Sequence, residues 1–309
     1  MDGLPQFLSP SLTAPHQRTL KASIACVGTG LHSGRRVRLS LGPAPAGHGI
    51  VFRRTDCQAD VPARFDQVVD ARLATTVGCS NTAGVRVGTV EHLLAALAGS
   101  GVDNAVVALD GPELPILDGS AAPWLFLIDC AGLIDQPEAP RQSIEVRRAV
   151  RVQDGESWAE LLPPGPYDGL EMAVSIDFSA AAIGRQSIAL RLSGESFRHE
   201  LARARTFALA EDVGAMRAAG LARGGTLENA VVVDGARVVN PDGLRMRDEF
   251  VRHKLLDAVG DLALAGAPLR ARFRAHRPGH ALTNRLLRAL FADPAAWREE
   301  TREPACVAA

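Results

Sequence analysis

The sequence predicts an α+β protein built from two similar halves, each with a β-sheet layer packed on helices. The main observation is a shared order of elements, because in each half short β-like runs precede a helix, a strand and a closing helix. A polar stretch at 134–143, which contains Pro137 and Pro140, separates the halves. The chain has 309 residues, a length that suits two domains of ordinary size.

The first half begins with runs that alternate apolar and polar residues or are rich in β-branched residues, as strands do. Residues 89–98 (TVEHLLAALA) have the apolar character of a buried helix, which Gly99 and Gly101 end. The predicted elements are strands at 19–27, 36–41 and 50–54, a helix at 89–98, a strand at 104–109 and a helix at 121–131.

The second half repeats this order and contains the longest helix pattern of the chain. That pattern covers 248–264, and Pro268 prevents its continuation. The predicted elements are strands at 144–152, 158–162, 170–177 and 186–192, helices at 195–203 and 210–219, a strand at 230–233, a helix at 248–264, a strand at 269–275 and a helix at 280–291.

These patterns predict an N-terminal domain at 18–136 and a C-terminal domain at 143–297. The proline-containing stretch 1–17 is predicted to be a flexible tail, and 298–309 a second tail. The chain starts with neither a basic region nor an apolar core, so we expect no secretory signal. No run of 18 consecutive apolar residues predicts a transmembrane helix.

Composition and charge narrow the class of function. Hydrophobic residues make up 47% and charged residues 22% of the chain, as in ordinary globular proteins. The net charge of −1 provides no global field for nucleic acid or an anionic membrane. The five cysteines are odd in number and form no CxxC pair, which argues against a disulfide scaffold or a thiolate zinc site. We therefore expect a cytoplasmic protein that binds no nucleic acid.

One face of the predicted helix at 248–264 carries His253, Asp257 and Asp261. Their i, i+4, i+8 spacing aligns them because a helix has about 3.6 residues per turn. An imidazole and a carboxylate one turn apart can bind one zinc ion. The same pattern taken alone is more often a solvated stripe with a His–Asp pair, so the spacing is suggestive and not specific.

Glu91 and His92 lie near the start of the otherwise apolar helix at 89–98. Adjacent helical residues point about 100° apart, so the two side chains cannot play one role. His92 is a candidate third zinc ligand, and Glu91 a candidate general base beside a metal-bound water. The alternative is a glutamate favoured by the helix dipole next to a partly buried histidine.

Two further side chains could complete a hydrolytic site. His280, at the entry of the last helix, could protonate a leaving amine if a carboxylate such as Asp261 keeps it charged. Thr206 offers a hydroxyl to a developing oxyanion, although an N-cap role explains it equally well from this segment alone. Together with the ligand candidates, these residues supply every part of a zinc hydrolase.

Six strings carry a resemblance to one family. In order, they are TGLHSG (29–34), TVEHLLAALAG (89–99), LDGSAAP (117–123), RARTF (203–207), DEFVRHKLLDAVGDLALAG (248–266) and GHALTNRLL (279–287). With these strings the chain resembles the UDP-3-O-acyl-N-acetylglucosamine deacetylases, zinc amidases of bacterial lipid A synthesis, from about Arg18 to about Phe291. The resemblance implies two two-layer α/β sandwich domains whose helix layers face each other, with the active site between them.

The resemblance also assigns roles to individual residues. It implies one Zn²⁺ per chain, held by His92, His253 and Asp257. It implies the following catalytic residues: Glu91 as general base, His280 as general acid oriented by Asp261, and Thr206 for the oxyanion. The substrate-binding residues that it implies are Lys254, Phe207, His32 near the diphosphate, Asp177 and Phe178 near the uracil, and Arg277 in place of a frequent lysine.

Two positions depart from the pattern of the family. Ser157 lies where close relatives have a lysine, and Leu209 lies where a phenylalanine often lines the acyl passage. These departures concern contact with the nucleotide and the fit of the acyl chain.

The resemblance implies hydrolysis of the N-acetyl group of UDP-3-O-(3-hydroxyacyl)-N-acetylglucosamine, with release of acetate, in a Gram-negative bacterium. This reaction is the committed step of lipid A biosynthesis. The alternatives are a zinc amidase for another N-acyl sugar and a non-catalytic metal or nucleotide-sugar binding protein on the same fold. The expected partner is the UDP-sugar lipid precursor. No motif indicates a protein partner, and we expect a monomer.

Overall fold

The computed structural model describes residues 14–78 and 84–301 and contains one large sheet in each half of the chain. The first sheet has the strand order β2-β3-β9-β4-β5. Only β4 and β9 pair in parallel within it. Its strands are β2 (Ile24–Thr29), β3 (Arg36–Pro43), β4 (Ile50–Arg54), β5 (Ala59–Pro62) and β9 (Ala105–Leu109).

The second sheet repeats this arrangement around its central strand β19. β19 pairs antiparallel with β13 and parallel with β14, and the hairpin partners β12 and β15 lie outside them. The strands are β12 (Val150–Asp154), β13 (Ser157–Leu162), β14 (Leu170–Asp177), β15 (Arg185–Arg191) and β19 (Leu269–His276). The added strands β11 (Gln142–Val146) and β20 (Trp297–Thr301) continue the sheet from the start of β19.

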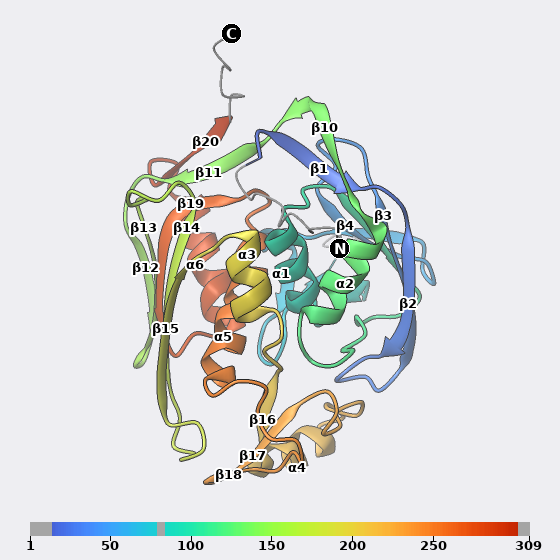
Figure 1. Cartoon of the computed structure of the whole chain (residues 1–309), viewed down its shortest axis with the longest axis vertical. Helices are drawn as coiled ribbons and strands as arrows, with labels where there is room; N and C mark the ends of the chain where they lie inside the picture. Colours follow the sequence, from blue (N-terminus) through green and yellow to red (C-terminus); the bar gives the residue numbers. More distant parts are fainter. Residues whose placement is uncertain (1–13, 79–83, 302–309) are drawn as a thin grey trace, which may run out of the picture.

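Each central strand lies between two helices along the chain. β9 follows α1 (Glu91–Ser100) and precedes α2 (Ala122–Ala131), and β19 follows α5 (Glu249–Ala263) and precedes α6 (His280–Ala292). Figure 1 shows the two sheets on the outside of the molecule with these helices between them. The predicted fold class, two similar α+β layers with facing helices, is thereby confirmed.

The helices of the two halves meet at α1 and α5, which pack directly on each other. Gly260 allows this approach, because a Cβ at this position would lie 2.0 Å from the backbone oxygen of Glu91. Buried apolar residues from both halves form one continuous core around this contact. The start of α1 is therefore held against the middle of α5.

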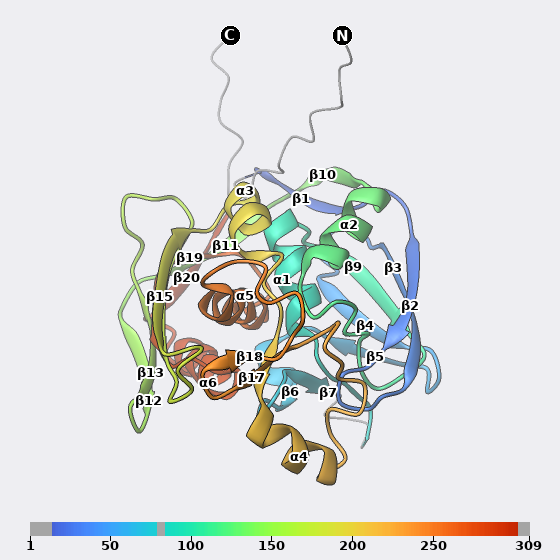
Figure 2. The same cartoon turned by 60° about the horizontal axis from the view of Figure 1, so that its bottom comes forward.

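Two small three-stranded sheets and several short helical segments lie outside this frame. One sheet contains β6 (Val68–Asp70), β7 (Thr76–Gly78) and β8 (Arg86–Val87). The other contains β16 (Phe207–Leu209), β17 (Val231–Asp234) and β18 (Arg237–Val238), next to helix α4 (Ala210–Ala218). The short segments are η1 (Phe65–Gln67), α3 (Gly194–Ser196) and η2 (Phe197–Leu201). Figure 2 shows both small sheets near the end of the molecule to which α4 belongs.

The segment 134–143, which the sequence predicts to be a polar linker, is largely a strand. β10 (Leu133–Pro140) pairs antiparallel with β1 (His16–Leu20) in a two-stranded ribbon. Each strand of such a ribbon has a free edge, so Pro137 and Pro140 can be accommodated without a missing hydrogen bond. The prolines therefore do not prevent a strand here.

Other boundaries also differ from those predicted. The predicted strand at 19–27 is two strands, because the chain turns at 21–23 between β1 and β2. β1 includes His16 and Gln17 of the predicted N-terminal tail, and β20 includes 298–301 of the predicted C-terminal tail. The division of the chain into two domains stays a prediction. No helix among the described residues is long and apolar enough to cross a membrane.

Candidate active site

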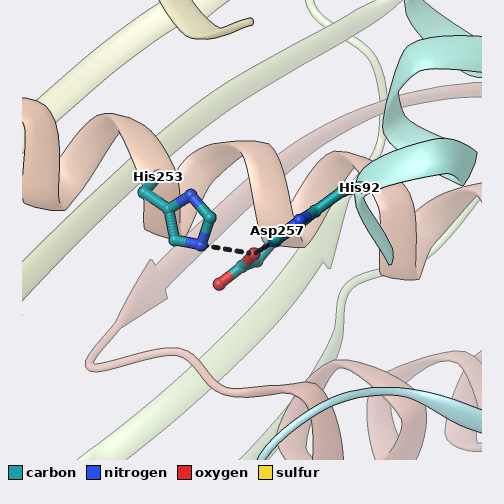
Figure 3. A group of neighbouring side chains, drawn as sticks. All are labelled: His92, His253 and Asp257. Atoms are coloured by element: carbon teal, nitrogen blue, oxygen red, sulfur yellow. Dashed lines mark ion pairs between the residues drawn. The ribbon is translucent and has the colours of Figure 1, made fainter. Parts of the chain in front are cut away.

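The three predicted metal ligands meet where α1 packs on α5. His92 lies in the first turn of α1, and His253 and Asp257 lie on successive turns of α5. Figure 3 shows both imidazole rings directed toward the Asp257 carboxylate. The Asp257 Oδ1 atom lies 3.2 Å from His253 Nε2 and 3.6 Å from His92 Nε2. Ligands bound tetrahedrally to one zinc ion at about 2.0–2.1 Å lie about 3.3 Å apart, so these separations fit a zinc ion.

The surroundings leave the metal-facing atoms available for coordination. His253 Nδ1 lies 3.0 Å from the backbone oxygen of Ala204, so this nitrogen donates and Nε2 keeps its lone pair. The Asp257 Oδ2 atom accepts from Lys254 at 3.1 Å, whereas Oδ1 is buried and accepts no hydrogen bond from the described part of the chain. A buried acceptor without a partner is costly unless a cation binds it.

The charge states suit a metal as well. Burial lowers the pKa of His92, which favours the neutral ring that coordinates metals. Burial opposes ionisation of Asp257, but His253 and Lys254 outweigh it and hold the pKa of this carboxyl well below its usual range. The neutral His92 imidazole and the ionised Asp257 carboxylate are the forms that bind a metal.

Glu91 and His280 face each other beside the ligand group. The Glu91 Oε1 and His280 Nε2 atoms are 3.9 Å apart, and both side chains are buried. Burial raises the pKa of Glu91 to about 7, with help from Asp257 and Asp261 and against the opposing effect of His280. A carboxylate with this pKa is poised to accept a proton near neutral pH.

The environment of His280 keeps its ring protonated. Its Nδ1 atom donates to the Asp261 Oδ2 atom at 2.9 Å. Burial would lower the pKa of His280, but Asp261 and Glu91 outweigh burial and raise it to about 9. Near pH 7, Glu91 can therefore act as a base and His280 as an acid.

The segment around Thr206 and Phe207 borders the ligand group. The Phe207 ring centroid lies 6.3 Å from that of His253 and 5.5 Å from that of Phe178, and Lys254 Nζ lies 5.6 Å from the Phe207 ring. The backbone N–H of Thr206 donates to Gly119 O at 2.8 Å. The structure therefore brings Lys254, Phe178 and Phe207 together beside the ligands.

His32 is positioned by its backbone and not by its ring. Its backbone N–H donates to the Glu113 Oε1 atom at 2.8 Å, while both ring nitrogens are buried without a hydrogen-bond partner among the residues described. Burial lowers the pKa of His32; Glu113 acts against this effect and His280 adds to it. The ring of His32 is thus close enough to His280 for an electrostatic interaction.

Asp177 and Arg277 form a separate charged group at the carboxyl ends of β14 and β19. Asp177 Oδ2 lies 2.9 Å from Arg185 Nη2 and 3.9 Å from Arg277 Nη2. Arg277 also pairs with Glu156 at 2.6 Å, one residue before Ser157. These contacts join Asp177 and Arg277 to each other and not to the ligand group.

Leu209 ends β16 and borders a small hollow of ≈ 230 Å³ together with Ala180, Glu211 and Val233.

Two buried residues of the site were not predicted from the sequence. The Thr75 backbone N–H donates to Glu91 Oε2 at 3.0 Å, and its hydroxyl to Asp261 Oδ1 at 2.5 Å. Glu113 accepts from the backbone of His32 and from the Thr89 hydroxyl at 3.0 Å. Neither residue belongs to a spaced polar pattern, so only the tertiary contacts reveal them.

The fold and this arrangement define a class. A site between two helix layers with two imidazoles and a carboxylate for a metal, and a base facing an acid, is that of a metal-dependent hydrolase. The model of the family UDP-3-O-acyl N-acetylglycosamine deacetylase matches residues 17–292. The chain belongs to this family.

Curated relatives support this assignment over most of their length. A protein of Myxococcus xanthus is 51% identical over 284 residues, which cover 91% of this chain and 88% of the relative. Proteins of Chromobacterium violaceum and Acidithiobacillus ferrooxidans are each 49% identical over 285 residues, with 91% of this chain and 92% and 91% of the relatives covered. All three relatives are named UDP-3-O-acyl-N-acetylglucosamine deacetylase.

Proposed function

We propose that the chain hydrolyses the N-acetyl group of a UDP-3-O-(3-hydroxyacyl)-N-acetylglucosamine and releases acetate, the committed step of lipid A biosynthesis. The names of the relatives supply the substrate. The observation that supports catalysis is the 3.9 Å approach of Glu91 Oε1 to His280 Nε2 beside three potential metal ligands. A protein that only binds a nucleotide sugar needs no such pair.

His92, His253 and Asp257 would hold one zinc ion, because three nitrogen and oxygen ligands with an open position are typical of catalytic zinc. When bound, zinc lowers the pKa of a water molecule to about 7 and polarises a carbonyl oxygen. Lys254 stays paired with the Asp257 Oδ2 atom, so its charge remains beside the site.

The chain's own residues would then move the protons. Glu91 accepts a proton through Oε1 from the water whose oxygen attacks the acetamide carbon, while Thr75 holds Oε2. The Thr206 hydroxyl donates to the developing oxyanion. His280, held through Nδ1 by Asp261, gives its Nε2 proton to the sugar nitrogen as the carbon–nitrogen bond breaks.

The remaining predicted residues would bind the substrate. Phe207 and Phe178 form an apolar surface beside the ligands, and His32 lies on the side of His280. Asp177 and Arg277 are proposed to contact the nucleotide from the carboxyl ends of β14 and β19, at a distance from the reacting amide. The site would lie between a domain at 18–136 and a domain at 143–297, in a cytoplasmic monomer.

The substrate is tested by acetate release from purified, zinc-loaded protein. We expect release from UDP-3-O-acyl-N-acetylglucosamine and much slower release from free N-acetylglucosamine and from UDP-N-acetylglucosamine without the acyl chain. Equal or faster release from another N-acyl sugar would indicate a different amidase. No release from any of them, with zinc bound, would indicate a binding protein.

A further inference from the structure

Thr75 connects the two proton-transfer groups through a series of three hydrogen bonds. It lies directly before β7 and is 1% exposed. Its backbone N–H donates to Glu91 Oε2 at 3.0 Å, and its hydroxyl donates to Asp261 Oδ1 at 2.5 Å. Asp261 Oδ2 accepts from His280 Nδ1 at 2.9 Å. The series of hydrogen bonds therefore runs from Glu91 through Thr75 and Asp261 to His280.

The atoms that remain outside these bonds are those that the reaction needs. Glu91 Oε1 and His280 Nε2 point toward each other at 3.9 Å, while the other polar atom of each side chain is held. Thr75 holds Glu91 directly and holds His280 through Asp261. One residue thus connects the base on α1 with the acid relay that starts on α5.

The Thr75 carbonyl belongs to the same arrangement. It accepts the backbone N–H of Val90, the residue before the first turn of α1, at 3.2 Å. All three polar groups of Thr75 are therefore paired with residues of α5 or of the start of α1. The backbone groups of any buried residue need partners, so the hydroxyl bond to Asp261 is the contact specific to threonine.

We propose that Thr75 is a positioning residue that sets the distance and orientation between the general base and the general acid. This inference rests on the proposed function, since it concerns the same proton transfers. The hydroxyl gives Asp261 Oδ1 a charge-assisted bond, which fixes the carboxylate plane and with it the His280 ring. The backbone bond fixes Glu91 independently of the side chain at position 75.

The proposal predicts different activities for two substitutions of Thr75 that have nearly the same size. Thr75→Val keeps the shape and the backbone bonds but leaves Asp261 Oδ1 without its donor, whereas Thr75→Ser keeps the hydroxyl. Misplacement of a catalytic group typically costs about 10²-fold in rate. We expect kcat of Thr75→Val to fall about 10- to 100-fold with KM and bound zinc unchanged, and Thr75→Ser to retain most activity.

Thr76→Val is the matched control, because it removes a threonine hydroxyl one residue further on that takes no part in this series of hydrogen bonds. A double-mutant cycle with Asp261→Asn tests whether Thr75 acts through Asp261. If it does, Thr75→Val causes little further loss in the Asp261→Asn protein. Full additivity, or a kcat for Thr75→Val equal to that of Thr76→Val, would overturn the proposal.

A spectroscopic measurement tests the positioning role of Thr75 without an assay of deacetylation. The His280 Nδ1 proton, hydrogen-bonded to buried Asp261, is expected as a downfield proton resonance in the zinc-loaded protein. It should shift or broaden in Thr75→Val and persist in Thr75→Ser and Thr76→Val. An unchanged resonance in Thr75→Val contradicts the positioning role. If the three variants show the expected resonances but the wild-type protein does not deacetylate the substrate, only the proposed substrate is contradicted.

Discussion

Residues of the same type have different tasks in this site because their neighbours differ. Asp257 and Asp261 lie one turn apart on α5, and both are buried. Asp257 has one oxygen toward the imidazoles that accepts no hydrogen bond from the described residues, whereas both oxygens of Asp261 are held, by Thr75 and His280. The surroundings, and not the residue type, suit Asp257 to the proposed role of a ligand and Asp261 to that of an orienting group.

This difference predicts that substitutions of Asp257 and Asp261 affect the zinc content differently. Asp257→Asn replaces the carboxylate oxygen between the two imidazoles with a weaker ligand, so zinc per chain should fall well below that of the wild type. Asp261→Asn is the matched control one turn away and should keep zinc while it loses activity. Metal analysis after gel filtration gives the answer. Equal zinc in both variants would contradict the ligand assignment.

The two facing groups predict a bell-shaped dependence of kcat/KM on pH. Activity needs ionised Glu91, so it rises as the pH passes the pKa of this group, about 7 in the metal-free chain and lower beside a bound cation. Activity needs protonated His280, so it falls as the pH passes about 9, or less beside a cation. A pH–rate profile at constant zinc occupancy measures both limbs. In His280→Gln the basic limb should be lost, and its persistence would assign that limb to another group.

At the scale of elements, the sequence predicts strong patterns well and weak ones poorly. The helix at 248–264 is observed as α5 within one residue at each end, because its apolar face is long and Pro268 follows. The stretch 134–143 is β10 instead of a linker, since its pairing with β1 depends on a segment more than 100 residues away. The spacing along the helix indicates His253 and Asp257 as candidate ligands, but their proximity to His92 arises only in the tertiary structure. No local sequence pattern indicates Thr75.

The close contact of α1 with α5 predicts a strong effect of a single methyl group. In Gly260→Ala, the added Cβ would lie 2.0 Å from the Glu91 backbone oxygen, so the helices must separate. We expect the free energy of unfolding to fall by about 1–3 kcal/mol, as for other overpacked cores. Urea denaturation measures it.

Gly214→Ala is the control for this substitution. Gly214 lies in α4, and a Cβ there would meet no described heavy atom within 4 Å. This variant should be more stable than the wild type by about 0.5–1 kcal/mol, because alanine favours a helix over glycine. A similar change of stability in both variants would mean that the helix contact is not tight.

At the scale of the whole molecule, two sheets with the same strand order bring two helix pairs face to face. Each half alone carries only part of the site: His92 and Glu91 come from α1, and His253 and Asp257 from α5. The repeated order of elements along the chain predicts this architecture. The orientation of one half relative to the other is set by packing in the shared core, which the repeated order of elements does not predict.

A metal held by both halves should stabilise the whole chain. A ligand that binds only the folded protein adds about 2.7 kcal/mol when its free concentration is 100 times Kd. We expect a higher Tm with zinc than after chelation, and no zinc dependence in Asp257→Ala. Differential scanning calorimetry measures this shift. An equal zinc effect in Asp257→Ala would place the stabilising metal elsewhere.

The most direct test of the central claim is the rate of acetate release from UDP-3-O-acyl-N-acetylglucosamine by wild type and Glu91→Gln at equal zinc occupancy. Glu91→Gln keeps the size of the side chain and the ligands on α1 and α5 but removes the proton acceptor that faces His280. The account predicts a fall in kcat of about 10²–10⁴-fold with zinc retained. Near wild-type turnover by Glu91→Gln would contradict it.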